Sequence, residues 1–160
     1  MKVEYIAPFA EAAVGVFEAL IGMTPERGQL KVSPSMNTMQ QINVVCGLTG
    51  QLEGIVVYGM SMITADKIAS KMLGQPVITF DALAASAIAE LGNMVSGHSS
   101  ARLASLGYEC DITPPTIIRG LNVSISTTDI PAIQIPLELP DLGVFELSVS
   151  LRQRVSLAAA

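Results

Sequence analysis

The segment from Asp81 to Gly107 constrains the fold of this chain more than any other part of its sequence. It is rich in Ala, begins with a residue type that commonly caps helices, and ends with one that commonly terminates them. We therefore predict a continuous helix over roughly residues 82 to 105. A helix of this length has to bury its apolar side against another layer of the same domain.

The predicted helix has two different faces. At about 100° per residue, a polar or small set lies within a sector of about 60°, and an apolar set lies on the opposite side. The polar or small set is Ser86, Glu90, Asn93 and Gly97, and the apolar set is Ala84, Ile88, Leu91, Val95 and Leu106. One face is expected to pack and the other to present polar groups. Glu90 and Asn93 are three residues apart, so their side chains are neighbours.

Two glycines, Gly92 and Gly97, lie inside this helix. Each costs roughly 1 kcal/mol relative to Ala, which suggests that something approaches the helix closely. The approaching group is either another element of the same chain or an incoming macromolecule that needs access to Glu90 and Asn93. Polar helix faces are usually just solvated, so the pattern alone leaves both interpretations open.

Two further helices and several strands are expected around this segment. Helical spacing predicts a long helix near residues 3–21, stopped near Gly22, and a short helix at 64–73, capped by Ser61 or Thr64. β-Favouring segments at 41–46 and 52–58, separated by Gly47-Leu-Thr-Gly50, predict a hairpin. Extended or alternating segments at 108–112, 122–126, 132–135 and 145–151 predict the remaining strands.

The order of these elements contains a faint internal repeat, because each long helix is followed by strands. Pro131, Pro136 and Pro140 are expected to confine their strand to an edge or a bulge. We predict an α/β domain of the α+β type, in which an antiparallel sheet is covered by two long helices with pseudo-two-fold symmetry. The domain is expected to span residues 1–155, with a frayed tail at 156–160.

Charge and composition exclude several classes of function. The net charge is −5, and the nine Lys and Arg form no basic run, which argues against a nucleic-acid partner. No uninterrupted apolar stretch is long enough to span a bilayer, so we expect a soluble, cytoplasmic protein without a membrane partner. Cys46 and Cys110 are expected to be reduced thiols. With His98 as its one histidine, the sequence shows no cluster at metal-ligand spacing.

The spacing Ser86-x-x-x-Glu90-x-x-Asn93, followed by Pro115, resembles the signature of the CheC, CheX and FliY family of response-regulator phosphatases. The strings Glu-Leu-Gly-Asn-Met at 90–94 and Asp-Ile-Thr-Pro-Pro-Thr at 111–116 look more like CheX than CheC. The resemblance covers nearly the whole chain. It implies a phosphatase that acts on the aspartyl phosphate of a CheY-like receiver domain, in chemotaxis or a related two-component pathway, and a homodimer paired through its sheets.

The resemblance also implies a role for each site residue. A response regulator holds its phosphoryl group as an aspartyl phosphate with a bound Mg²⁺ and a Lys, and hydrolysis needs a water aligned behind phosphorus. Asn93 is expected to orient that water and Glu90 to pair with the regulator's Lys, which makes these the catalytic residues. Ser86 and Gly97 are expected to contribute to binding. No cofactor is expected in this chain, because the partner supplies the Mg²⁺.

A single active helix is expected. The N-terminal helix offers Ala7-x-x-x-Glu11-x-x-Val14, with Val14 where the carboxamide of Asn93 stands in the later helix. We therefore expect Val14 to be related to Asn93 by the approximate two-fold symmetry. Two other functions stay open: a non-catalytic adaptor for a phosphorylated receiver domain, and a sensor with an apolar pocket for a small ligand.

Overall fold

A computed structural model describes residues 1–125 and 129–155, and the predicted tail at 156–160 lies outside the described residues. The described residues form a mixed α+β fold with a large antiparallel sheet, as predicted. The helices are α1 (Val3–Ile21), α2 (Met62–Leu73) and α3 (Ala82–Ser105). The strands are β1 (Glu26–Arg27), β2 (Lys31–Ser33), β3 (Met36–Thr38), β4 (Ile42–Gly50), β5 (Leu52–Met60), β6 (Cys110–Ile112), β7 (Thr116–Arg119), β8 (Val123–Ile125), β9 (Ala132–Leu139) and β10 (Gly143–Gln153).

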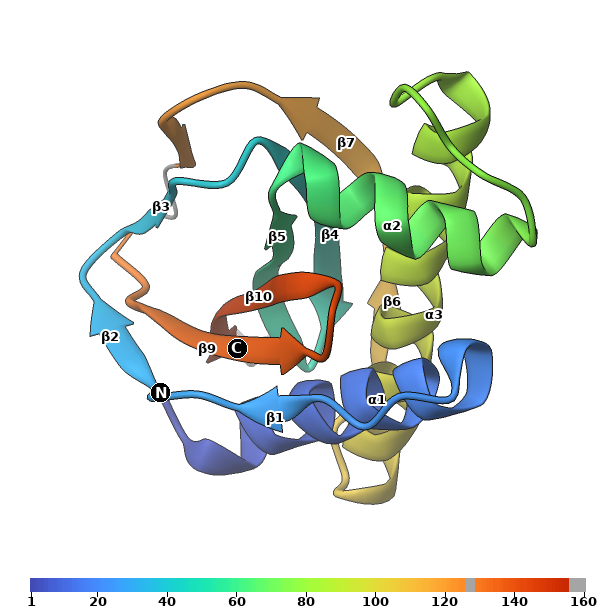
Figure 1. Cartoon of the computed structure of the whole chain (residues 1–160). Coiled ribbons are helices and arrows are strands. Elements are labelled where there is room, and N and C mark those ends of the chain that lie inside the picture. The colour runs from blue at the N-terminus through green and yellow to red at the C-terminus, as the bar shows by residue number, and fades with distance from the viewer. Residues whose placement is uncertain (126–128, 156–160) are drawn as a thin grey trace.

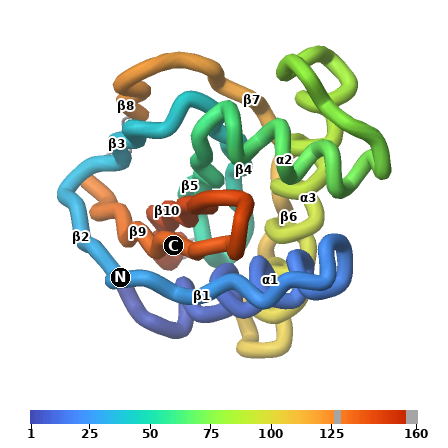
Figure 2. The backbone as a smooth tube through the Cα atoms, in the orientation of Figure 1, coloured from blue at the N-terminus to red at the C-terminus, as the bar shows by residue number. Residues whose placement is uncertain are grey.

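Eight of these strands form one sheet in the order β1-β9-β10-β5-β4-β6, with β2 paired to β9 and β7 paired to β4. The short strands β3 and β8 pair separately, at the side of the molecule away from α3 (Figures 1 and 2). Exchanging β1 with β6, β2 with β7, β4 with β9 and β5 with β10 gives the same order read backwards. The topology therefore has the pseudo-two-fold symmetry that the sequence predicted.

The strand order does not by itself decide whether Val14 is related to Asn93. α1 and α3 are followed by Gly22 and Gly107, which have left-handed φ values of 71° and 94°. Asn93 lies fourteen residues before Gly107, and the same count back from Gly22 reaches Pro8. Counted from these glycines, the position that corresponds to Asn93 is Pro8 and not Val14, and the relation of Val14 to Asn93 stays a prediction. Pro8 also lacks a carboxamide, so this shift gives no reason to expect a second site.

The predicted hairpin exists, but Gly47-Leu-Thr-Gly50 is not its turn. These residues belong to β4, which turns into β5 at Gln51. Gly47 is needed for a different reason, because a Cβ there would lie 3.1 Å from the Thr113 side chain. Gly50 has a φ of 126°, a value that favours glycine.

The prolines had predicted an edge or a bulge. The strand that contains Pro136 is not an edge strand, but Pro136 lies at a bulge, because residues 28–30 oppose only Ile135 and Pro136 between β1 and β2. β9 pairs with β10 on one side and with β1 and β2 on the other. Pro136 is tolerated because it lies in the gap between β1 and β2, where no ladder hydrogen bond from its nitrogen is required. Its carbonyl still accepts a hydrogen bond from the Gly28 N–H at 2.8 Å.

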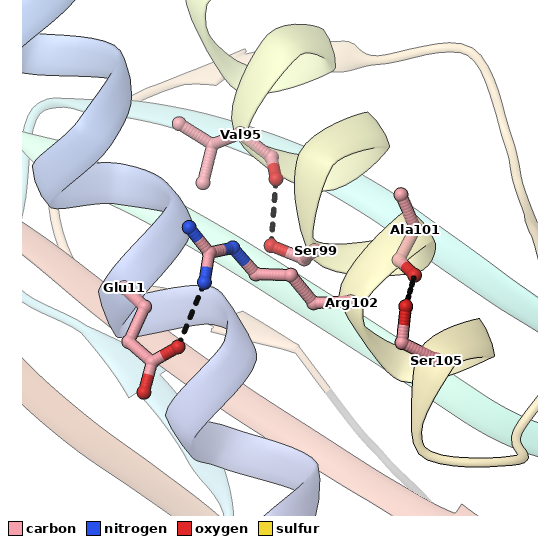
Figure 3. Close-up of polar contacts among 6 residues, drawn as sticks. All are labelled: Glu11, Val95, Ser99, Ala101, Arg102 and Ser105. Atoms are coloured by element: carbon pink, nitrogen blue, oxygen red, sulfur yellow. Dashed lines mark hydrogen bonds and ion pairs between the residues drawn. The ribbon is translucent and has the colours of Figure 1, made fainter.

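α1 and α3 cover the same face of the sheet. Phe17 of α1 contacts the ring of Phe145 with centroids 5.0 Å apart, and the Phe145 ring stacks on Tyr58. At the surface, Arg102 of α3 donates to the Glu11 carboxylate of α1 at 2.9 Å (Figure 3). The two long helices thus share one apolar core with the central strands.

The predicted apolar face of α3 is buried, with one exception. Ala84, Ile88, Leu91 and Val95 are fully buried, whereas Leu106 is 55% exposed because it follows the last turn of the helix. Gly92 lies directly on the sheet, where an added Cβ would be 2.6 Å from Val44 Cγ1. Gly97 is different, because an added Cβ there would have only Ile112 Cδ1 as a neighbour, at 4.0 Å.

These two glycines give opposite predictions for stability. Gly92→Ala gains about 1 kcal/mol of helix propensity but overpacks the core, at a typical cost of about 1 to 3 kcal/mol. Gly97→Ala gains the propensity without the clash. Urea unfolding should therefore rank Gly97→Ala above the parent protein and Gly92→Ala below it. A Gly92→Ala protein as stable as Gly97→Ala would contradict the close contact of α3 with the sheet.

Candidate functional site

Three of the four predicted site residues lie together on α3. Ser86 and Glu90 are exposed, and Asn93 is half-buried. They line a surface groove of about 470 Å³ between α3 and the segment that follows β6. The groove is lined by Ser86, Ala89, Glu90, Asn93, Ile112, Thr113, Pro114 and Pro115. Gly97, the fourth predicted residue, is half-buried one turn beyond Asn93 and does not line the groove.

The opposite wall of the groove is held by Thr113. The Gly47 N–H donates to Thr113 Oγ1 at 2.8 Å, and the Thr113 N–H donates to the Gly47 carbonyl at 2.9 Å. These two bonds attach the segment to β4, and Pro114 and Pro115 restrict the backbone that follows. The sequence had indicated Pro115 and the string Asp-Ile-Thr-Pro-Pro-Thr at 111–116, but not that Thr113 attaches this segment to β4. The pairing of Gly47 with Thr113 was missed from the sequence, because the two residues are far apart in the chain and no local pattern connects them.

The start of α3 is fixed as predicted. The Asp81 side chain accepts a hydrogen bond from the Ala84 N–H at 2.9 Å and caps the helix. Next to it, the Arg119 guanidinium of β7 lies 5.2 Å from the centre of the Phe80 ring. The turn that leads to Ser86 is therefore held from both sides.

The polar groups of the site are free to contact a partner. Across residues 1–125 and 129–155, neither the Glu90 carboxylate nor the Asn93 side chain has a hydrogen bond or ion pair with another side chain. A carboxamide can donate and accept hydrogen bonds at the same time, and a carboxylate accepts them with a negative charge. The groove can therefore align a water molecule beside a negatively charged contact point.

Other features of the described residues bear on cofactors and location. They contain no group of three or more His, Cys, Asp or Glu side chains that could hold a metal ion. His98 is exposed, and Cys46 and Cys110 are free thiols. No helix in the described part of the chain is long and apolar enough to cross a membrane.

Comparison with known proteins connects this geometry to a family. The profile of the family described as "Chemotaxis phosphatase CheX" matches residues 42–138. The CheY-P phosphatase CheX of Thermotoga maritima is 32% identical over 151 residues, which cover 91% of this chain and 97% of that protein.

Solved structures agree with this match. A CheX–CheY–BeF3–Mg²⁺ complex from Borrelia burgdorferi superposes with a TM-score of 0.82 at 30% identity, covering 95% of this chain and 100% of that one. The chemotaxis protein CheX of Desulfovibrio desulfuricans gives a TM-score of 0.83 at 26% identity, with the same coverage.

Proposed function

This chain belongs to the CheX family of chemotaxis phosphatases, and from that premise we propose that it hydrolyses the aspartyl phosphate of a CheY-like response regulator. Asn93 positions the attacking water, and Glu90 contacts the regulator. The reaction belongs to chemotaxis signalling through a two-component pathway and takes place in the cytoplasm. The Mg²⁺ that phosphoryl transfer requires is bound by the regulator.

One observation carries the proposal: Glu90 and Asn93 lie side by side on the accessible face of α3, at a groove whose other wall is fixed by Thr113. A rigid helix can enter the site of a partner domain and still hold both side chains in one orientation. Hydrolysis of an aspartyl phosphate asks the protein chiefly for positioning and placement of charge. The Asn93 carboxamide can position a water molecule, and the Glu90 carboxylate can place a negative charge.

In the proposed mechanism, the oxygen of a water molecule attacks phosphorus while the bond from phosphorus to the aspartyl oxygen breaks. The products are inorganic phosphate and the free aspartate carboxylate, and the proton of the water leaves with the phosphate or to solvent. The Asn93 carbonyl oxygen accepts a hydrogen bond from the water and so directs its lone pair at phosphorus. The carboxamide is not a strong base, so its contribution is orientation.

Glu90, Ser86 and Gly97 are assigned to binding in this proposal. The Glu90 carboxylate pairs with the regulator's active-site Lys and sets the register of α3 on the partner. Ser86 lies one turn before Glu90 on the same exposed face and can donate a hydrogen bond to the partner. Gly97 leaves open space one turn after Asn93, which lets the partner surface approach.

The family assignment favours a phosphatase over the small-ligand sensor considered from the sequence. Support for the partner comes from the Borrelia burgdorferi relative, which was solved with CheY, BeF3 and Mg²⁺. A non-catalytic adaptor would bind the same partner, so a phosphatase and an adaptor are distinguished by the rate at which the partner loses its phosphate. The direct experiment measures phosphate release from a phosphorylated CheY-like receiver domain with and without this protein, and an unchanged rate despite binding would identify an adaptor.

Asn93→Ala should remove most of the rate enhancement, on the order of 100-fold, because it removes the group that aligns the water. Regulator binding should change little, since the water is held chiefly during the reaction. Asn93→Asp should be no better, because it puts a negative charge beside the phosphoryl group. His98→Ala is the control, since His98 is exposed on the same helix without an assigned role. A folded Asn93→Ala protein with the parent rate would exclude this mechanism.

Glu90→Ala should weaken binding as well as turnover. Leaving the partner's Lys unpaired in a water-poor interface costs on the order of 2 kcal/mol or more, which is about a 30-fold increase in Kd. Glu90→Gln keeps the size of the side chain and should lose as much affinity as Glu90→Ala if the charge is what matters. Titration of each variant with the phosphorylated receiver domain measures this. Parent affinity in Glu90→Gln would show that no ion pair forms.

We also propose that the protein is a homodimer paired through its sheet. The β2 edge carries exposed apolar side chains, with Val32 68% exposed and Leu30 beside it. An exposed apolar edge strand is an aggregation risk that pairing across a symmetry axis relieves.

Light scattering at micromolar concentration should give about twice the 16.8 kDa mass of one chain. Val32→Lys should shift the protein toward monomer, because a charge on an edge strand opposes pairing. Val3→Lys changes an exposed valine at the start of α1 and should leave the mass unchanged. A monomeric mass for the parent protein would rule out the dimer, and a dimeric Val32→Lys protein would exclude this edge.

A further inference from the structure

We propose that Tyr58 and Ser96 are positioning residues for the candidate site, because the hydrogen bond between them fixes the rotation of α3 that directs Asn93 into the groove. Their hydroxyl oxygens lie 2.6 Å apart, and both side chains are fully buried. Tyr58 belongs to the central strand β5, and Ser96 follows Asn93 by three residues on α3. This inference rests on the proposed function of Asn93.

The Tyr58 hydroxyl is a fixed point in the core. Its ring stacks on Phe145 with centroids 5.6 Å apart and an interplanar angle of 22°. Phe145 is held in turn by an edge contact with Phe17 of α1. β5 has hydrogen-bonded neighbours on both sides, β4 and β10. A group bonded to this hydroxyl is therefore held in a fixed position relative to the central strands of the sheet.

Apolar packing restrains the rotation of α3 less directionally than a hydrogen bond does. Burial of apolar surface is non-directional, and Gly92 has no side chain to interlock with the sheet. Side-chain ends lie about 5 to 6 Å from a helix axis, so a rotation of about 10° moves them by about 1 Å. A displacement of about 1 Å can lower a rate by about 100-fold when a reaction depends on alignment. Two directional bonds restrain that rotation: Ser96 to Tyr58, which is the nearer to Asn93, and Ser100 Oγ to the Cys110 carbonyl at 2.7 Å, one turn further along α3.

The surroundings of the two hydroxyls strengthen this restraint. Burial raises the pKa of Tyr58 above its usual value, so its hydroxyl stays neutral and keeps its proton for hydrogen bonding. The Cys46 thiol also faces Ser96, and burial raises the pKa of that thiol as well. A rotation of α3 that separated Ser96 from Tyr58 would leave a buried hydroxyl without its partner, and that penalty opposes the rotation.

Ser99 provides a matched control on the same helix. It is fully buried, like Ser96, but its hydroxyl donates to the Val95 carbonyl within α3 at 2.6 Å (Figure 3). Ser99→Ala therefore removes a buried serine hydrogen bond without removing a link between α3 and the sheet. Any general effect of losing a buried hydroxyl should appear equally in Ser96→Ala and Ser99→Ala.

The kinetic test measures phosphate release from a phosphorylated CheY-like receiver domain. Ser96→Ala and Tyr58→Phe should each lower kcat by about tenfold or more, with KM changed by less than about twofold. The double variant should lose no more than the worse single variant, because both remove one bond. Ser99→Ala should keep the parent kcat. Equal kcat values for Ser96→Ala and Ser99→Ala would overturn the proposal.

A second measurement separates this inference from the proposed function. The side-chain amide signals of Asn93 in the NMR spectrum of the unbound protein, assigned by their loss in Asn93→Ala, should shift or split in Ser96→Ala and Tyr58→Phe but not in Ser99→Ala. A parent protein without phosphatase activity would refute the proposed function, and the amide signals would still decide whether the bond orients Asn93. Unchanged Asn93 signals in Ser96→Ala would overturn the positioning role even in an active enzyme.

Discussion

The direct contact of Gly92 with Val44 and Tyr58 sets how near α3 lies to the sheet, and the candidate site depends on that distance. Any larger residue at position 92 has to lift the helix or displace Val44. Lifting α3 would move Glu90 and Asn93 relative to Thr113, which is bonded to β4 and does not move with the helix. The depth of the groove on the exposed side of α3 thus depends on the packing of Gly92 on its buried side.

The core is built to make such close approach possible. Aromatic residues are only 4% of the chain, and three of them form the contact series Phe17, Phe145 and Tyr58 at the centre of the domain. Elsewhere α1 and α3 present many alanines to the core, which allows helix and sheet backbones to approach closely. The three aromatic rings then fix the positions of the strands and of α1, and the small side chains let the helices lie close to the sheet.

Features that depend on local chemistry could be predicted from the sequence. The bounds of α3, its Asp81 cap and the separation of its buried and exposed faces follow from helix geometry and capping. Features that depend on residues far apart in the chain could not. Gly47 and Thr113, which are hydrogen-bonded, are 66 residues apart in the chain. The reason for a glycine at position 92 is its contact with Val44, which is also distant in the sequence. Gly92 and Gly97 show why sequence patterns are not enough here. Both are glycines on one helix, but Gly92 packs against the sheet and Gly97 faces open space.

The exchange symmetry of the sheet has a consequence for how the chain assembles. The β4–β5 and β9–β10 hairpins join neighbouring residues, whereas the central β5–β10 pair joins residues such as Val57 and Ser148, about ninety positions apart. Closing so long a loop costs more entropy than closing a hairpin, so we expect the hairpins to form before the central pair. α3 contacts Val44 and Tyr58 from the N-terminal hairpin, so the two repeats cannot mature as separate folding units. During synthesis on the ribosome, the groove can form only after Pro115 has emerged, because its two walls lie on α3 and on residues 112–115.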